Sequence, residues 1–251
     1  METHCPPRLS RRTFLTSMSA MLLAGTAGQA LARDYPGGVL PWNAYSSAPP
    51  VQVVPGGWHF FSPAEAQIVE EIVDRIIPED DLSIGGKEAG CALYIDRQLA
   101  GYYGDSSRLY TKGPFLPGLP TQGYQGEATP AQRYRRGLAA IAKYLKAEKS
   151  GATFASLSDD DKDAFLKDLE AGKIELPDKV NAKSFFQLIL GNTMEGFFAD
   201  PIYGGNKDMV SWKMLGFPGA RYDYREYVSK HNEPFPLPPV SIAGATDWQT
   251  K

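Results

Sequence analysis

Three ionisable residues in this sequence, Glu195, His59 and Asp200, are candidates for acid–base chemistry. Glu195 lies in the most apolar stretch of the chain, where burial is expected to shift the pKa of a carboxyl group. Together with His59 or Asp200 it would supply the acid and the base of a self-sufficient enzyme. An alternative of equal weight is a structural ion pair between Glu195 and one of three cations, Lys213, Arg221 or Arg225.

The sequence holds two cysteines, Cys5 and Cys91. If the N-terminal segment is removed on export, as argued below, Cys91 is left without a partner in its own chain. We therefore expect either a buried thiol or a disulfide with another subunit. The acidic run Asp159–Asp163 lacks the spaced ligands of a calcium loop and is more typical of a solvated first turn of a helix.

The segment 200–219 combines glycines with large aromatic side chains. Glycine permits backbone conformations that other residues resist, and aromatic residues dominate the centres of protein interfaces. The simple alternative is an internally packed loop. The sequence predicts a rigid surface for another protein, with these interface candidates: Asp200, Tyr203, Gly204, Gly205, Asn206, Trp212 and Phe217. Tyr203, Trp212 and Phe217 are expected either to pack on the partner or to brace a loop that does.

Several functions find no support in the sequence. No Gly-x-Gly-x-x-Gly follows a predicted strand, so we expect no flavin or nicotinamide site in this chain, and no phosphate-binding loop or nucleophile elbow is present. With three histidines and two cysteines, we also expect no haem-attachment motif and no zinc or His-rich metal site. A net charge of −3 gives no drive toward nucleic acid. A soluble sugar-binding protein that uses exposed aromatic residues stays open as a third function.

The elements that must position these residues are helices. Capping signals at Ser62, Thr129 and Ser158 start three of them, and apolar residues follow at helical spacing. Further helices are predicted over 88–99, 182–198 and about 209–215, and the helix over 182–198 is apolar on nearly every face. Residues 101–128 read as a long loop. We expect an all-α fold: one domain of about five main helices with long ordered loops and extended arms at both ends.

The N-terminus has the pattern of an export signal over residues 1–32. Ser10, Arg11, Arg12, Phe14 and Leu15 resemble a twin-arginine motif, and Ala30 and Ala32 form an A-x-A cleavage site. Polar residues interrupt the apolar segment, which argues against a membrane anchor. We predict a signal peptide over 1–32, a Pro/Gly-rich arm over 33–57 and the helical domain with its extended tail over 58–251.

The stretch EGFFADPIYGGNKDMVSWKMLGFPG, Glu195–Gly219, resembles the signature of the gluconate 2-dehydrogenase subunit 3 family. Shorter matches support this resemblance and extend it over nearly the whole mature chain; they are Gly57–Phe61, Arg75–Pro78, Glu88–Gly90, Tyr94–Asp96, Leu157–Ser158 and Leu169–Gly172.

The resemblance implies a small subunit that has no active site or cofactor of its own. Its implied partners are a large dehydrogenase subunit of the glucose-methanol-choline type, which holds FAD, and a multi-haem cytochrome c subunit. The small subunit is implied to supply the export signal for the twin-arginine translocase and to support maturation of the flavoprotein. We accordingly expect a periplasmic location, contact with the membrane only through the complex, and gluconate or a related sugar or sugar acid as the partner's substrate.

Overall fold

The computed structural model describes residues 52–107, 109, 112–116, 118–221 and 223–243. The predicted signal residues and cleavage site lie outside this range, as does most of the predicted arm, so those expectations stay predictions. The described residues form helices, turns and loops and no strand; a single isolated bridge joins Gly219 to Val240. The expected all-α fold is confirmed for this part of the chain.

Capping signals define where three of the helices begin. Ser62 caps α2 (Pro63–Ile76) and Thr129 caps α5 (Pro130–Glu148), each with a capping box and a proline in the first turn. Ser158 caps α6 (Asp159–Ala171), which ends at Gly172 in a left-handed conformation. The predicted starts of all three helices are correct because a cap and a helix-favouring first turn are local features of the sequence.

The second predicted helix begins later than expected. α3 spans Cys91–Leu99, not 88–99, because Gly90 adopts a left-handed conformation (φ 82°) directly before the helix and Lys87–Gly90 form a turn. The predicted loop also contains structure: a short helix, α4 (Tyr102–Asp105), and one 3₁₀ turn, η1 (Pro120–Gln122). A four-residue helix carries too few periodic positions to be seen in a sequence.

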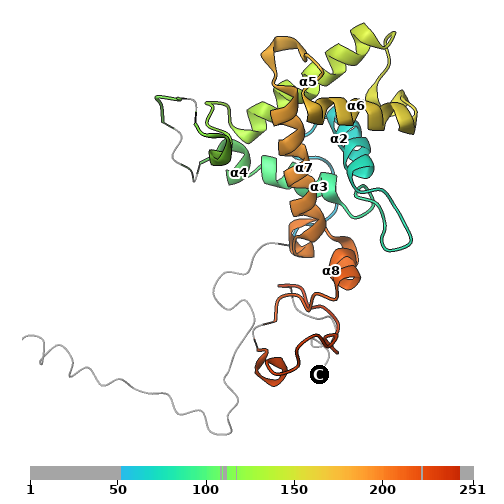
Figure 1. Ribbon diagram of the computed structural model, residues 1–251, viewed down its shortest axis with the longest axis vertical. Coiled ribbons are helices and arrows are strands. Elements are labelled where there is room, and N and C mark those ends of the chain that lie inside the picture. The colour runs from blue at the N-terminus through green and yellow to red at the C-terminus, as the bar shows by residue number, and fades with distance from the viewer. Residues whose placement is uncertain (1–51, 108, 110–111, 117, 222, 244–251) are drawn as a thin grey trace, which may run out of the picture. The chain divides into compact units, whose positions relative to one another are not determined.

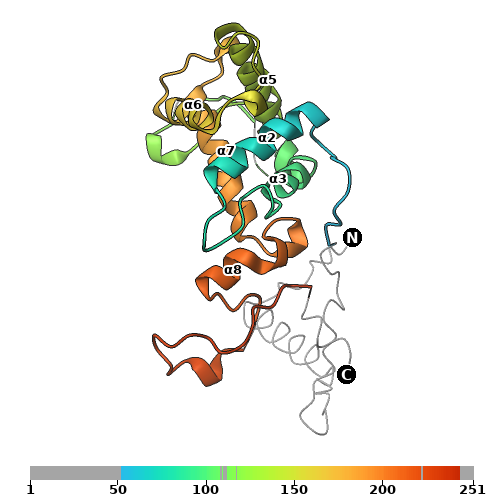
Figure 2. The same cartoon turned by 90° about the vertical axis from the view of Figure 1, so that its right-hand side faces the viewer.

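Helix α7 (Ala182–Phe198) is the centre of the fold, and α2, α3, α5 and α6 pack around it (Figure 1). The turned view shows α8 (Val210–Leu215) beyond the C-terminal end of α7 (Figure 2). The expectation that α7 is buried on nearly every face is wrong for one side, where Gly191, Met194 and Glu195 are exposed. No described helix packs over this side of α7.

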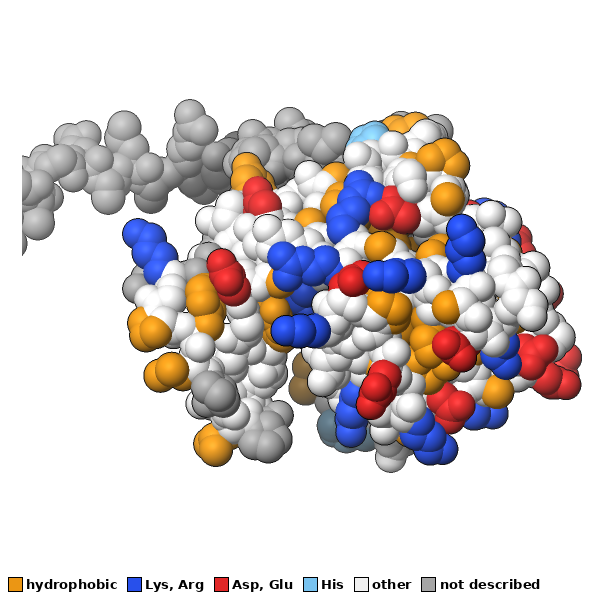
Figure 3. Space-filling model, turned by 90° about the horizontal axis from the view of Figure 1, so that it is seen from above, with side chains coloured by type: hydrophobic (Ala, Val, Ile, Leu, Met, Phe, Trp, Pro, Cys, Tyr) orange, Lys and Arg blue, Asp and Glu red, His pale blue; other side chains and the backbone are white. Residues whose placement is uncertain are grey.

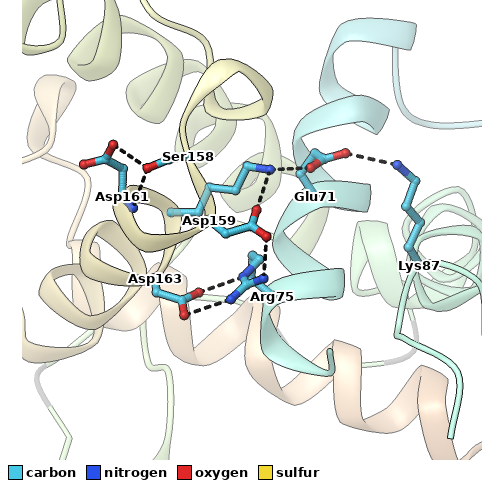
Figure 4. Close-up of polar contacts among 8 residues, drawn as sticks. Glu71, Arg75, Lys87, Ser158, Asp159, Asp161 and Asp163 are labelled. Carbon is cyan, nitrogen blue, oxygen red and sulfur yellow. Dashed lines mark hydrogen bonds and ion pairs between the residues drawn. The ribbon is translucent and has the colours of Figure 1, made fainter. Parts of the chain in front are cut away.

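The core lies between α7 and the inward faces of its neighbours. On α5 the four residues at helical spacing, Tyr134, Leu138, Ile141 and Leu145, are all fully buried. Outside the core, α2 and α6 are joined by ion pairs: Arg75 binds Asp163 and Asp159, while Lys162 binds Glu71 at 2.7 Å (Figure 4). The acidic first turn of α6 is thus partly an inter-helix contact and not only a solvated end.

Candidate partner interface

The segment 200–219 folds back on the end of α7 and is held there by buried polar side chains. Asp200 accepts hydrogen bonds from the backbone of Ile202 (2.9 Å) and Ile242 (2.7 Å) and from the hydroxyl of Ser241 (2.6 Å). Both carboxylate oxygens are therefore occupied inside the protein. The hydrogen bonds from Ser241 and Ile242 to Asp200 hold residues 240–242 against the segment 200–219.

The turn formed by Gly204, Gly205 and Asn206 packs closely against the end of α7. A Cβ atom at Gly205 would lie far inside contact distance of the Gly196 carbonyl, so only glycine fits there. Asn206 is fully buried in a left-handed conformation; its amide donates to Ala199 O (2.8 Å) and its oxygen accepts from the backbone and hydroxyl of Ser211. The turn thereby bridges the end of α7 and the start of α8.

Trp212 completes this packing. Its indole Nε1 donates to Phe198 O at 2.9 Å, and its ring meets that of Phe217 edge-on with centroids 5.2 Å apart. Asp200, Gly205, Asn206 and Trp212 are all buried, so none of them offers an exposed contact surface, and for Trp212 the bracing role is the expectation that the geometry favours. They brace the segment instead.

The exposed apolar side chains of the segment belong to other residues. Tyr203 (37% exposed) and Phe217 (46%) were predicted, whereas Met214 (37%) and Leu215 (62%) at the end of α8 were not. In the sequence, Met214 and Leu215 form an apolar pair directly before Gly216, and this pair could have indicated their exposure at a helix end. We call Tyr203, Met214, Leu215 and Phe217 the apolar rim; it is available to a partner, while Gly204 contributes only the turn (φ 98°).

Glu195 stands at the end of a hydrogen-bonded chain that enters the core. It accepts from Asn192 Nδ2 (3.0 Å), and Asn192 Oδ1 accepts from the hydroxyls of Tyr134 (3.0 Å) and Tyr103 (3.2 Å). Burial, with Glu195 nearby, raises the pKa of Tyr94 to about 12, and burial raises the pKa of Tyr134 well above its ordinary value. Tyr134 thus stays protonated to higher pH than an ordinary phenol and remains a donor to Asn192.

The acid–base arrangement suggested by the sequence is not assembled among the described residues. Glu195 hydrogen-bonds neither to His59 nor to Asp200, and it forms no ion pair with a described cation. The backbone amide of His59 donates to Asp96 (2.9 Å), while the residue itself is exposed. Asp200 is occupied as described above. No group of three or more potential metal-ligating residues occurs within the described ranges.

Sequence reasoning missed the role of Asp96. This fully buried carboxylate accepts three backbone amides, from His59, Phe60 and Phe61, each at 2.9 Å, and it also binds Arg97. These hydrogen bonds fix the backbone of residues 59–61, which directly precedes α2. In the sequence, Asp96 lies beside the apolar residues Cys91, Ile95 and Leu99 of a predicted helix, and this position indicates a buried carboxylate.

Cys91 is fully buried at the start of α3, and burial raises the pKa of its thiol to about 12. A thiol in this environment is protonated at neutral pH and inaccessible to a disulfide partner. Of the two expectations, the structure favours the buried thiol.

No helix in the described part of the chain has the length and apolar character needed to cross a membrane. In a comparison with protein-family models, residues 63–219 match the family described as gluconate 2-dehydrogenase subunit 3. The chain belongs to this family. The family name implies that the chain is a subunit of a dehydrogenase complex. The match includes the whole apolar rim and its four bracing residues. Neither a curated protein nor a solved structure gives a match.

Proposed function

We propose that the chain is the non-catalytic small subunit of a membrane-associated, flavin-dependent gluconate dehydrogenase, or of a close relative acting on a sugar or sugar acid. The observation that carries the proposal is the family match over residues 63–219, which includes the whole braced segment. In this proposal FAD resides in a glucose-methanol-choline-type large subunit and haem c in a cytochrome subunit.

The apolar rim supports the assignment of a partner surface. Four apolar side chains, Tyr203, Met214, Leu215 and Phe217, are exposed on a segment whose backbone is fixed by buried Asn206 and Trp212. Exposed apolar side chains on a fixed backbone lose less conformational entropy on binding than those on a mobile loop, which favours a stable interface. The dehydrogenase subunit is the proposed occupant.

The test is co-expression of the full chain with the dehydrogenase subunit of the same organism. The double variant Tyr203→Ser/Phe217→Ser is expected to weaken the complex by about tenfold or more, since both substitutions remove apolar area at the rim. Leu82→Ser is the matched control, because Leu82 is exposed (74%) on the loop between α2 and α3. A chain that stays monomeric beside a fully active dehydrogenase would refute the proposal.

We also propose that residues 1–32 direct export of the complex by the twin-arginine route to the periplasm, and that the small subunit supports maturation of the flavoprotein before export. Export of a folded partner requires the signal on only one chain. Changing Arg11 and Arg12 to lysine is expected to leave the dehydrogenase in the cytoplasm; normal export of the dehydrogenase by this variant would exclude this role.

A further inference from the structure

A cavity of about 650 Å³ lies between the long loop and the helical body. Phe115, Leu116 and Tyr124 line it from the loop, Arg133 from the first turn of α5, and Ser184 and Leu188 from α7. Figure 3 shows the loop standing away from the body, with Lys and Arg side chains beside the hollow that separates them. This cavity is distinct from the apolar rim, which belongs to residues 203–217.

Arg133 is the charged group in this cavity. Its guanidinium lies 4.0 Å above the ring of Tyr124, and its Nη2 donates to the carbonyl and hydroxyl oxygens of Ser184, both at 3.0 Å. Among the described residues it has no carboxylate partner, whereas Arg75 binds two carboxylates and Arg135 binds one. Burial lowers the pKa of the Arg133 guanidinium, which indicates desolvation that no nearby anion offsets.

Two of the polar side chains that line the cavity are already engaged within the protein, while Gln187 is a further polar lining residue. Ser184 is already bound to Arg133, and the side-chain amide of Gln125 donates to Gln122 O at 2.8 Å. By contrast, Phe115 (42%) and Leu116 (70%) expose apolar area at the mouth. Arg133 is the charged side chain among the lining residues, and a carboxylate is the group that complements it best. One carboxylate flanked by apolar groups therefore matches the lining.

We propose that this cavity receives an extended segment of the partner dehydrogenase subunit, in which an Asp or Glu carboxylate pairs with Arg133 and adjacent apolar side chains pack on Phe115 and Leu116. The guanidinium is suited to this role because it can bind a carboxylate through two parallel hydrogen bonds while stacked on Tyr124. The inference rests on the proposed function, since it needs a partner subunit, and it adds a second contact site with defined chemistry.

The first experiment compares Arg133→Gln with Arg136→Gln in the co-expressed, purified complex. Both substitutions remove one positive charge from α5, but Arg136 is exposed and does not line the cavity. We expect the dissociation constant to rise by about tenfold or more for Arg133→Gln and by less than about twofold for Arg136→Gln. The salt dependence of the affinity should also be weaker in Arg133→Gln than in the wild type.

A second variant guards against a folding defect, because Arg133 also holds Ser184. Phe115→Ser/Leu116→Ser changes only exposed loop side chains and should weaken the complex with an unchanged melting temperature. A photoreactive benzoyl-phenylalanine at position 116 should cross-link to a partner peptide that contains Asp or Glu beside apolar residues. The same probe at Leu82 should not reach that peptide.

The outcomes separate this inference from the proposed function. If a complex forms, Arg133→Gln binds as well as the wild type and the position-116 probe gives no partner cross-link, the cavity inference fails while the proposed function stands. If the wild type forms no complex, both fail. Saturable binding of free gluconate to the full chain, lost in Arg133→Gln, would overturn the peptide assignment in favour of a small-molecule site.

Discussion

The carboxylate of Asp96 in α3 accepts a hydrogen bond from the backbone amide of Phe61 at 2.9 Å, across a sequence separation of 35 residues. The same side chain, fully buried, also accepts the amides of His59 and Phe60. Two short motifs, Gly57–Phe61 and Tyr94–Asp96, are therefore parts of one structural unit. This unit anchors the start of the described chain to the second main helix.

Asp96→Asn is expected to destabilise the protein by about 2–3 kcal/mol, because an amide has one acceptor oxygen and its NH₂ group would face backbone donors. Urea unfolding monitored by circular dichroism measures the change. Asp80→Asn is the control: Asp80 also accepts two backbone amides, those of Leu82 and Ser83, but in an exposed loop, so its cost should stay below about 1 kcal/mol. Equal costs for both variants would show that burial of Asp96 contributes nothing.

Glu71→Gln is expected to cost about 1–2 kcal/mol at pH 7, because it leaves the nearly buried ammonium of Lys162 without its closest carboxylate. The hydrogen bond from Lys162 holds the pKa of Glu71 below its ordinary value of 4.5. A lowered folded-state pKa contributes stability above the unfolded value, and this contribution is lost as the pH falls through the folded value.

The difference between wild type and Glu71→Gln should therefore shrink as the pH falls below about 4 in a series of urea titrations. Lys143→Gln breaks the exposed pair with Asp178 and should cost less than about 0.5 kcal/mol. A Glu71→Gln effect that is the same at pH 3 and pH 7 would contradict the ion-pair explanation.

Gly205→Ala is expected to destabilise by about 2–3 kcal/mol, because its methyl group would overlap the Gly196 carbonyl, and both groups belong to backbone. Gly191→Ala is the matched control in the neighbouring helix. Open space surrounds a Cβ there, so alanine should stabilise α7 by about 0.5–1 kcal/mol. Thermal unfolding of the two variants gives the test, and a neutral Gly205→Ala would argue against the close approach.

Cys91 is expected to react with a thiol reagent only after unfolding. Its thiol is buried and has a pKa of about 12, so at pH 8 the reactive thiolate is scarce and shielded. The measurement is the rate of absorbance change with a disulfide reagent, in buffer and in concentrated urea. A native rate close to the denatured rate, or a reduction-sensitive cross-link to another subunit, would disprove the buried assignment.

The sequence by itself determined where α2, α5 and α6 begin and which face of α5 enters the core. On α5, Thr129, Pro130 and the spacing of Tyr134, Leu138 and Ile141 act within one or two turns, so their consequences are local and readable. The motif 195–219 likewise identified the family, because a long run of specific residues is information in the sequence itself.

Only the tertiary structure decided which residues of that motif face a partner. Asn206 and Trp212 are polar or amphipathic, like surface residues, yet each is buried because its hydrogen-bond partner comes from the end of α7. In the same way Asp96 acquires its role from amides 35 to 37 positions away, and Arg133 is half-buried because Tyr124 of the loop and Ser184 of α7 contact its guanidinium. Contacts between residues distant in the chain leave no spacing pattern, and burial depends on all of them together.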